Sequence, residues 1–308
     1  MSILVVSPGR DPKVWVKELR LRLPDHDVYA WTEDLKIDKE KVDFAVSWKH
    51  PFGIYHEYPN LKVISSMGAG VDHITGDPDI SKEITVTRII DEQLTVDMSA
   101  FVLALIMNYL KNISFHHRNN TWEPKKYLKV EDVNVGILGL GILGSGLAKV
   151  LRKNDFKVSG WSNSEKKIDG VSTYQGEGQL LEFLRSTNIL VCLLPLTPET
   201  DSILNRDLFL QLPKGAYVIN VARGEHLVEK DLLEMVQEGH LSGASLDVFR
   251  TEPLPADHPF WKEPNILITP HIASITDPRK VVPQVAENYR RFKAGKDLIN
   301  VVLRDKGY

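Results

Sequence analysis

A glycine-rich segment limits the folds open to this chain more than any other feature of its sequence. The segment VGILGLGILGSG (135–146) follows an apolar run typical of a β-strand and opens a stretch with helical spacing. The pattern G-x-G-x-x-G falls on Gly139, Gly141 and Gly144. In a strand–turn–helix unit these glycines permit a tight turn, a close approach of the backbone to a pyrophosphate, and close packing of the helix on the strand. The segment therefore predicts a Rossmann domain that binds a dinucleotide. The alternative is a Rossmann fold that has lost its ligand.

Strand-like and helix-like stretches alternate along the rest of the chain, which predicts βαβ units around mainly parallel sheets. The expected strands are 3–7, 28–31, 43–47, 62–66 and 84–88 in a first series, and 133–139, 156–161, 188–195, 216–222, 243–249 and 266–269 in a second. The expected helices are 14–23, 95–112, 141–154, 178–187, 229–239 and 281–295. The polar stretch 116–132 is predicted to be a loop or arm, and the tail 299–308 is expected to return to the first series.

Composition and charge narrow the class of protein. The chain has 308 residues and a formal net charge of −3, which offers no long-range attraction to nucleic acid or to an anionic membrane. Its most apolar stretch, 100–107, is shorter than a membrane span, and its N-terminus lacks the basic region of a signal peptide. Cys192 is the only cysteine, so no intrachain disulfide can form, and the ten histidines show no metal-ligand spacing. We therefore expect a cytoplasmic protein with no metal site and with no nucleic-acid or membrane partner.

The loop after the second strand of the Rossmann unit indicates which dinucleotide binds. A carboxylate at this strand end would hydrogen-bond the ribose 2′-hydroxyl of NADH and repel the 2′-phosphate of NADPH. This chain has Ser162 in that place. The donors and cations that follow it are Asn163, Ser164, Lys166 and Lys167, and Glu165 is the one opposing charge. We predict a preference for NADPH, with NADH also accepted. The alternative is that the lysines only cover a solvated loop.

Three charged or titratable residues follow later predicted strands, at the edge where doubly wound sheets bind ligands. They are Arg223 in NVARG, Glu252 in LDVFRTEPLP and His271 in PHIA. Alone, each has an ordinary reading as a surface cation, a solvated acid or a core histidine. Together they supply what the reduction of a 2-keto acid needs. Arginine offers a planar cation for the carboxylate, histidine a proton donor that titrates near neutrality, and glutamate a charge that favours the imidazolium.

The sequence resembles the D-isomer-specific 2-hydroxyacid dehydrogenase family, and within it the bacterial glyoxylate/hydroxypyruvate reductase A type. The resemblance covers nearly the whole chain and rests on motifs in the family's order: SMGAGVDHI, VGILGLGILGSG, LLPLTPET, NVARG, LDVFRTEPLP and PHIA. It implies two doubly wound α/β domains with the active site in the cleft between them. The flavodoxin-like substrate domain would comprise 1–95 plus 279–308, and the Rossmann dinucleotide-binding domain would comprise 96–278.

The resemblance also assigns roles to single residues. It implies Arg223 as the substrate-binding cation, His271 as the acid/base and Glu252 as its partner. Besides the glycines and the loop at Ser162, the cofactor-binding residues that it implies are Ile142, Leu143, Pro195, Val221, Ala222 and Asp247. Pro195 would line the adenine side, and Asp247 would contact the nicotinamide amide. The substrate-binding residues that it implies are Ala69 and Gly70 through their backbone N–H groups, and Trp48, Arg88, Met98 and Trp122 through their side chains.

Some of these assignments leave an alternative open. Trp48 and Met98 can equally be core residues. Trp122, in NNTWEP (119–124), resembles an arm residue that crosses the interface of a homodimer to the partner's active site, or it is an ordinary loop tryptophan. The sequence also departs twice from the commoner family pattern. The acid is absent at Ser162, and CLLPLT lacks the histidine that many relatives carry before the proline.

These features predict NAD(P)H-dependent reduction of a small 2-keto acid, glyoxylate or hydroxypyruvate, to the 2-hydroxy acid. A first alternative is a dehydrogenase for a larger D-2-hydroxy acid, or another family member such as a phosphoglycerate or formate dehydrogenase. A second alternative is a dinucleotide-sensing binding protein of the same fold, as in the C-terminal binding protein corepressors, which keep the catalytic groups. Turnover of keto acids with NADPH distinguishes an enzyme from a binding protein.

Overall fold

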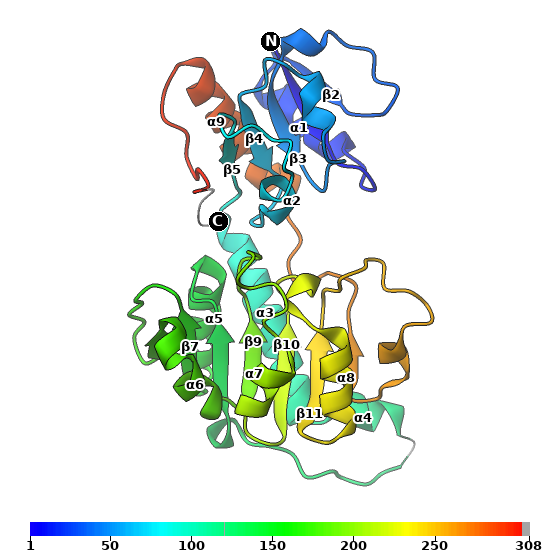
Figure 1. Cartoon of the computed structure of the whole chain (residues 1–308), viewed down its shortest axis with the longest axis vertical. Helices are drawn as coiled ribbons and strands as arrows, with labels where there is room; N and C mark the ends of the chain where they lie inside the picture. The colour runs from blue at the N-terminus through cyan, green and yellow to red at the C-terminus, as the bar shows by residue number, and fades with distance from the viewer. Residues whose placement is uncertain (120, 304–308) are drawn as a thin grey trace. The chain divides into compact units, whose positions relative to one another are not determined.

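The structure is a computed structural model that describes residues 1–119 and 121–303 (Figure 1). The chain divides into two compact units. Unit 1 comprises Met1–Asp91 and Thr276–Tyr308, and unit 2 comprises Glu92–Ile275. The domain boundaries predicted from the sequence lie a few residues from these limits.

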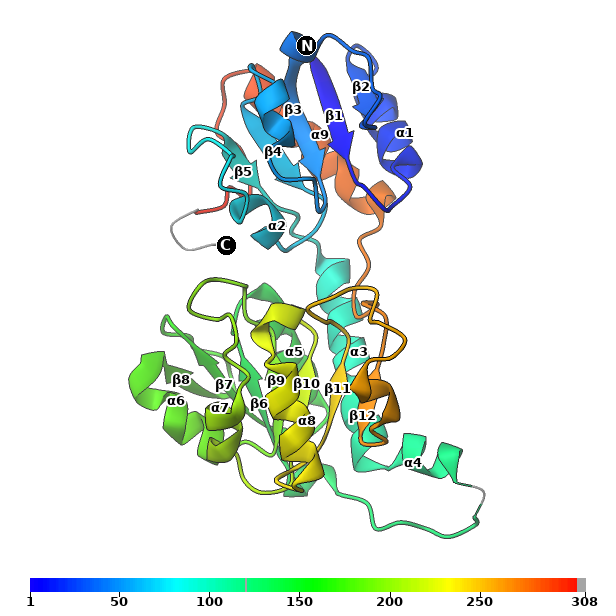
Figure 2. The same cartoon turned by 45° about the vertical axis from the view of Figure 1, so that its right-hand side comes forward.

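Unit 1 contains a five-stranded sheet in the order β2-β1-β3-β4-β5, in which every strand pair is parallel (Figure 2). The strands are β1 (Ser2–Val6), β2 (Asp27–Ala30), β3 (Val42–Ser47), β4 (Val63–Ser66) and β5 (Thr85–Thr87). The helical elements are α1 (Lys13–Arg22), η1 (Lys39–Lys41), η2 (Ile54–Glu57), α2 (Asp72–Thr75) and α9 (Pro278–Lys293). This strand order is that of flavodoxin-like folds, and the order in which strands are added to the sheet reverses between β1 and β3. The sequence prediction of a flavodoxin-like domain is therefore confirmed.

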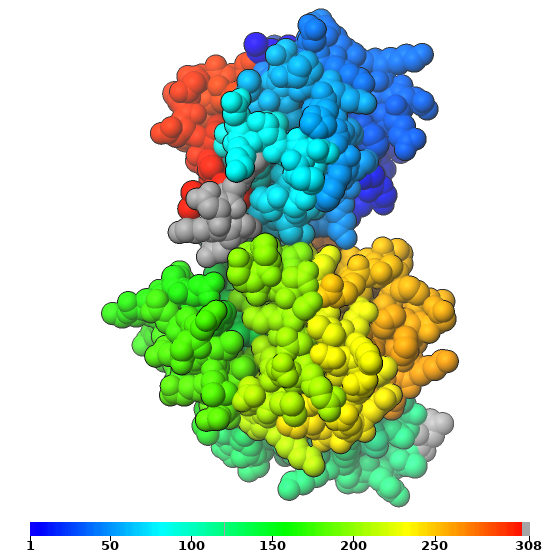
Figure 3. Space-filling view, viewed as in Figure 1, coloured from blue at the N-terminus to red at the C-terminus, as the bar shows by residue number. Residues whose placement is uncertain are grey.

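Unit 1 is built from both ends of the chain, as the blue and red segments in Figure 3 show. α1 and α9 pack together, and the ring of Phe44 on β3 meets that of Tyr289 on α9 with centroids 5.4 Å apart. The tail returns to the sheet, because the N–H of Val302 donates to the carbonyl of Val86 on β5 at 2.8 Å. The predicted return of the tail is thus confirmed as far as residue 303; residues 304–308 lie outside the described residues.

Unit 2 contains a seven-stranded sheet in the order β12-β11-β10-β9-β6-β7-β8, and again every pair is parallel. The strands are β6 (Asn134–Leu138), β7 (Lys157–Ser162), β8 (Ser172–Gln175), β9 (Ile189–Cys192), β10 (Ala216–Asn220), β11 (Leu241–Leu246) and β12 (Ile266–Ile268). The order in which strands are added to the sheet reverses between β6 and β9, as in a Rossmann fold. The predicted α/β class with two doubly wound sheets is confirmed.

Helices cover both faces of this sheet. They are α3 (Glu92–Leu110), α4 (Ile113–Arg118), α5 (Ile142–Lys153), α6 (Gly176–Arg185), α7 (Arg206–Gln211) and α8 (Glu229–Gln237), with the short helices η3 (Val130–Asp132), η4 (Gly224–His226) and η5 (Pro259–Lys262). Buried side chains of α3 and α5 form one core cluster with the sheet, and those of α6, α7 and α8 form another. α7 and α8 lie side by side on the surface (Figure 3), where Arg206 pairs with Glu238 at 2.7 Å.

α3 has the length and the hydropathy that a membrane-spanning helix needs, and it is the one described helix that has both. In unit 2 it packs against α5, and its residues Val102, Ile106 and Leu110 are completely buried. Its apolar composition is therefore accounted for by a place in the core of unit 2.

Four strands or α-helices of the structure were not predicted from the sequence: β8, α7, α4 and the four-residue helix α2. β8 is a half-exposed edge strand whose sequence, STYQ, lacks an apolar run. α7 is a helix of six residues, too short to show helical periodicity. α4 extends to Arg118, so the first residues of the stretch predicted as a loop, 116–118, are helical.

Candidate active site

The glycine loop between β6 and α5 has the geometry that a dinucleotide needs. Gly139 has a φ of 101°, and a Cβ there would lie 2.7 Å from the carbonyl oxygen of Leu193. A Cβ on Gly144 would lie 1.9 Å from the carbonyl oxygen of Gly139, so α5 can approach β6 only without a side chain. A Cβ on Gly141 would meet nothing within 4 Å, and no side chain caps the helix there. The open space at this helix N-terminus fits a pyrophosphate group.

The other residues expected along the dinucleotide lie at the start of α5 and after the strands β9 and β10. Ile142 is exposed and Leu143 half-buried in the first turn of α5. Pro195 follows β9, and its carbonyl accepts a hydrogen bond from the Thr200 hydroxyl at 2.7 Å. Val221 and Ala222 are buried in the core clusters, so they can face a ligand only through the backbone.

The loop after β7 keeps its donors exposed. Ser162 is buried, and its hydroxyl donates to the carbonyl of Ser164 at 2.7 Å. Asn163, Lys166 and Lys167 are exposed. Lys167 lies 3.5 Å from Glu165 in a pair whose members are both exposed, so the acid nearest Ser162 in this loop is next to a lysine.

A histidine–glutamate pair lies at the carboxyl edge of the same sheet. Nδ1 of His271 lies 3.0 Å from Oε2 and 3.1 Å from Oε1 of Glu252. Both side chains are half-buried, with 25% and 22% of their surface exposed. Because a carboxylate only accepts, Nδ1 carries a hydrogen atom. Nε2, which has no hydrogen-bond partner among the described residues, is then the nitrogen available for proton transfer.

The loop that carries His271 is held by Asp247. Asp247 directly follows β11, and its side chain is completely buried. Its Oδ1 accepts from the Thr269 hydroxyl at 2.6 Å and from the N–H of Ile272 at 2.9 Å, while its Oδ2 accepts from the N–H of Ala273 at 2.8 Å. The loop therefore donates three hydrogen bonds to this carboxylate, from Thr269, Ile272 and Ala273.

Arg223 follows β10, the neighbour of β11 in the sheet. It is half-buried, and its Nη1 donates to the carbonyl of Ala222 at 2.7 Å. The next residue, Gly224, is pressed against the loop after β11, because a Cβ there would lie 1.9 Å from the carbonyl carbon of Phe249. The strands β10, β11 and β12 thus bring Arg223, Glu252 and His271 to one edge of unit 2.

Two buried residues near Arg223 escaped the sequence analysis. Asn220 donates through Nδ2 to the carbonyl of Arg223 at 2.8 Å and accepts the N–H of Ala222 at 3.2 Å, so it shapes this turn. His226 lies within 2.8 Å of the carbonyl oxygen of Thr200 and 3.1 Å of that of Leu194. Burial lowers the pKa of His226. Asn220 and His226 are polar residues inside the motif NVARGEH. Their place in this motif was the sign in the sequence that they could have a role.

The predicted pocket residues of unit 1 gather at the carboxyl edge of its sheet. The half-buried ring of Trp48, after β3, lies 4.6 Å from the guanidinium carbon of Arg10 and 5.0 Å from the ring of His73. Ala69 and Gly70, after β4, are half-buried, and the carbonyl of Gly70 accepts from the Ser66 hydroxyl at 2.7 Å.

Arg88 follows β5 and is half-buried, and desolvation lowers the pKa of its guanidinium. Two other residues predicted to bind substrate belong to unit 2. Met98 is buried in the core cluster with α5, which is the alternative that the sequence left open. Trp122 is fully exposed.

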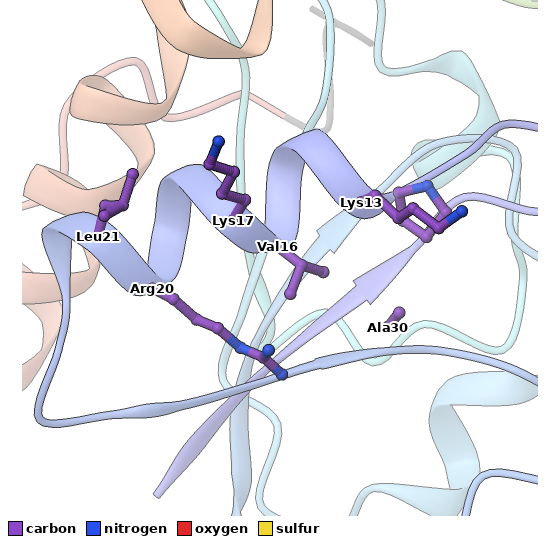
Figure 4. Close-up of a pocket in the computed structure, with 7 residues that line it drawn as sticks. Lys13, Val16, Lys17, Arg20, Leu21 and Ala30 are labelled. Atoms are coloured by element: carbon purple, nitrogen blue, oxygen red, sulfur yellow. The ribbon is translucent and has the colours of Figure 1, made fainter.

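A surface groove of about 550 Å³ lies along α1 in unit 1 (Figure 4). It is lined by Pro12, Lys13, Val16, Lys17, Arg20, Leu21 and Ala30. The guanidinium of Arg20 donates to the carbonyl of Val28 at 2.6 Å, so this charge is directed at the sheet. The groove includes none of the predicted site residues. Within residues 1–119 and 121–303, no group of three metal-ligating side chains is found.

Comparison with known proteins places these features in one family. The family model described as "D-isomer specific 2-hydroxyacid dehydrogenase, NAD binding domain" matches residues 100–273. Two relatives aligned over the full length of both chains are glyoxylate/hydroxypyruvate reductase A of Yersinia enterocolitica, at 35% identity, and of Serratia proteamaculans, at 37%.

Two solved structures have the same fold over the whole chain. A D-isomer specific 2-hydroxyacid dehydrogenase from Xanthobacter autotrophicus in complex with NADPH has a TM-score of 0.93 at 37% identity, with 100% of this chain and 99% of that chain covered. An NADPH-dependent glyoxylate/hydroxypyruvate reductase from Sinorhizobium meliloti in complex with NADP has a TM-score of 0.92 at 36% identity, with both chains fully covered. The chain belongs to the D-isomer-specific 2-hydroxyacid dehydrogenase family.

Proposed function

We propose that the protein reduces a small 2-keto acid, glyoxylate or hydroxypyruvate, to the 2-hydroxy acid with NADPH. The observation that carries the proposal is the contact of 3.0 Å between Nδ1 of His271 and Glu252, at the sheet edge where Arg223 also lies. The full-length relatives named as glyoxylate/hydroxypyruvate reductases support the choice of substrate. When bound, the nicotinamide supplies the hydride.

His271 donates the proton that the carbonyl oxygen needs as it becomes a hydroxyl. Nε2 carries this proton toward the substrate, while the N–H group at Nδ1 keeps its hydrogen bond to Glu252. The negative charge of Glu252 stabilises the imidazolium before transfer and fixes the orientation of the ring. Arg223 binds the substrate carboxylate through its planar guanidinium, for which lysine is no equivalent.

NADPH is the preferred cofactor, and NADH is also used. No carboxylate stands at Ser162 to repel a 2′-phosphate, and the exposed Asn163 and Lys166 can approach it. Two structures similar to this chain were solved with NADPH or NADP bound. The space around Gly141 accepts the pyrophosphate.

The two units have different tasks in this proposal. Unit 2 binds the dinucleotide and carries the proton donor. Unit 1 selects the keto acid: Ala69 and Gly70 offer backbone N–H groups to its carboxylate, and Trp48 with Arg88 limits the size of its side chain.

The protein acts as a homodimer in the cytoplasm. The segment after α3 carries exposed apolar side chains, which favours an interface between two copies. They are Ile113, Phe115, Trp122, Tyr127 and Leu128. Trp122 is the residue that would reach the partner's active site.

Steady-state kinetics with a panel of keto acids and both cofactors tests the proposal. Glyoxylate and hydroxypyruvate should give the highest kcat/KM, and NADPH should be better than NADH. Higher kcat/KM for keto acids with larger side chains would identify a dehydrogenase for larger D-2-hydroxy acids. Binding of NADPH without turnover of any keto acid would identify a dinucleotide-sensing binding protein.

A further inference from the structure

Asp247 is not one of the groups that touch the substrate in the mechanism above, yet it organises the loop of the proton donor. We propose that the Asp247 carboxylate is a positioning residue that keeps His271 in the backbone conformation from which its ring reaches Glu252. The inference rests on the proposed function, because it takes His271 as the proton donor. It adds an internal role for Asp247 to the contact with the nicotinamide amide that the family resemblance implies.

The backbone of His271 is in an uncommon conformation. Its φ is 54°, in the left-handed region that residues with a side chain rarely adopt. Such a residue remains there only where its surroundings determine the conformation. A left-handed residue in a turn also directs successive N–H groups to one side, which creates a concave site for an anion.

The carboxylate of Asp247 occupies this anion site. The N–H groups of Ile272 and Ala273 donate to its two oxygens at 2.9 Å and 2.8 Å, and the Thr269 hydroxyl donates to Oδ1 at 2.6 Å. The N–H of His271 donates to the main-chain oxygen of Asp247 at 2.8 Å. Four hydrogen bonds therefore join Asp247 to the loop on both sides of His271. Because they require the left-handed turn, the buried charge and the uncommon backbone conformation stabilise each other.

The position of the imidazole depends on this arrangement. The direction of the Cα–Cβ bond of His271 is set by its backbone, and the ring has one carboxylate contact, with Glu252 at 3.0 Å. A return to a right-handed conformation would turn the ring away from Glu252. Asp247 itself is 0% exposed, and both of its oxygens accept hydrogen bonds from the loop. Its effect on His271 therefore passes through the backbone of this loop.

The substitution Asp247→Asn tests the inference, since it keeps the shape of the side chain. It replaces one acceptor by an NH₂ group that faces an N–H donor, and it removes the charge. We expect kcat for glyoxylate to fall by about 10- to 100-fold, less than the roughly 10²–10⁴-fold loss for removal of an acid/base group itself. The Kd of NADPH, measured by fluorescence titration, should stay close to the parent value. A crystal structure of the variant should show His271 outside the left-handed region or away from Glu252.

A matched control is Asp231→Asn on α8. The Asp231 carboxylate also accepts a backbone N–H, that of Arg206 at 2.9 Å, and this variant should keep the parent kcat. A rise in the Kd of NADPH with unchanged kcat in Asp247→Asn would make Asp247 a cofactor ligand alone and overturn the proposal. So would a crystal structure with His271 and its Glu252 contact unchanged.

A second variant covers the case in which Asp247→Asn does not fold. Thr269→Val removes one donor to the carboxylate and leaves both N–H bonds. It should lower kcat by less than Asp247→Asn and leave the Kd of NADPH unchanged; a rise in that Kd with kcat unchanged contradicts the proposal. If the parent protein reduces no keto acid, the proposed function fails, and the conformation of His271 in the variant crystals still decides the role of Asp247.

Discussion

At the scale of single residues, the proposed chemistry depends on one imidazole, that of His271. We predict that His271→Ala loses about 10²–10⁴-fold in kcat, the usual effect of removing a general acid. The Kd of NADPH should change little, because the glycine loop is intact. Glu252→Gln retains an acceptor for Nδ1–H but no charge, so its kcat should fall less. Steady-state kinetics and fluorescence titration measure both effects, and near-parent kcat in His271→Ala would exclude His271 as the proton donor.

The candidate catalytic residues could be predicted from the sequence for a physical reason. Each of the three residues, Arg223, Glu252 and His271, follows a strand that is recognisable in the sequence as an apolar run. The carboxyl ends of neighbouring parallel strands meet at one edge of the sheet. The hydrogen bonds of the Asp247 side chain could not be predicted, because its partners Ile272 and Ala273 lie 25 and 26 residues away and donate through the backbone. Backbone donors carry no signature in the sequence.

The sequence also leaves undecided whether an apolar residue on a helix lies in the core or lines a pocket. Met98 fits both a pocket and a core, and only the packing of α3 on α5 shows that it is buried. A methionine side chain is unbranched and apolar, so its type alone is compatible with either place.

At the scale of elements, we expect two glycines between β6 and α5 to have different tasks. Gly144 permits close packing, and Gly141 leaves space for the ligand. Gly144→Ala forces a Cβ to 1.9 Å from the carbonyl of Gly139, so it should destabilise the protein by about 1–3 kcal/mol. Gly141→Ala meets nothing within 4 Å, so it should keep the parent Tm and raise the Kd of NADPH instead. Thermal unfolding and fluorescence titration compare the two. Equal loss of Tm in both variants would contradict this division.

We expect the residues at the end of β7 to determine the choice of cofactor. We predict that the parent protein prefers NADPH and that Ser162→Asp shifts the preference toward NADH, since an aspartate there would repel the 2′-phosphate and accept from a 2′-hydroxyl. A tenfold preference corresponds to only about 1.4 kcal/mol, so a few exposed donors and cations suffice. The measurement is kcat/KM for both cofactors at one ionic strength. Equal or better use of NADH by the parent would show that the exposed lysines only cover the loop.

A helix or strand can be predicted from its sequence when it is long enough and buried enough to show an apolar pattern. The buried strands β1, β6 and β9 are continuous apolar runs, as in parallel sheets covered on both faces, and all three were predicted. β8, at the sheet edge, is half-exposed and has no such run. α7 makes less than two helical turns, and tertiary contacts of Leu208 and Phe209 rather than periodicity account for it.

At the scale of the whole molecule, the two units differ in how the chain builds them. Unit 2 is one continuous segment with buried clusters on both faces of its sheet. Unit 1 needs both chain ends, because α9 from the C-terminal segment covers its sheet with Val282, Val285 and Tyr289, which are almost wholly buried. The clusters of unit 2 do not depend on this segment.

We therefore predict that the segment 92–275 folds alone and that the segment 1–91 does not. A continuous chain with its own core on a doubly wound sheet meets the requirements of an autonomous domain. Expressed separately, 92–275 should show one cooperative thermal transition by circular dichroism and should bind NADPH, because the glycine loop and the loop after β7 are complete. It should not reduce glyoxylate, because Ala69, Gly70 and Trp48 are absent. The segment 1–91 exposes the apolar face that α9 covers, and it should lack a cooperative transition. An unfolded 92–275, or a cooperative transition in 1–91, would show that the stability of the two units is not divided in this way.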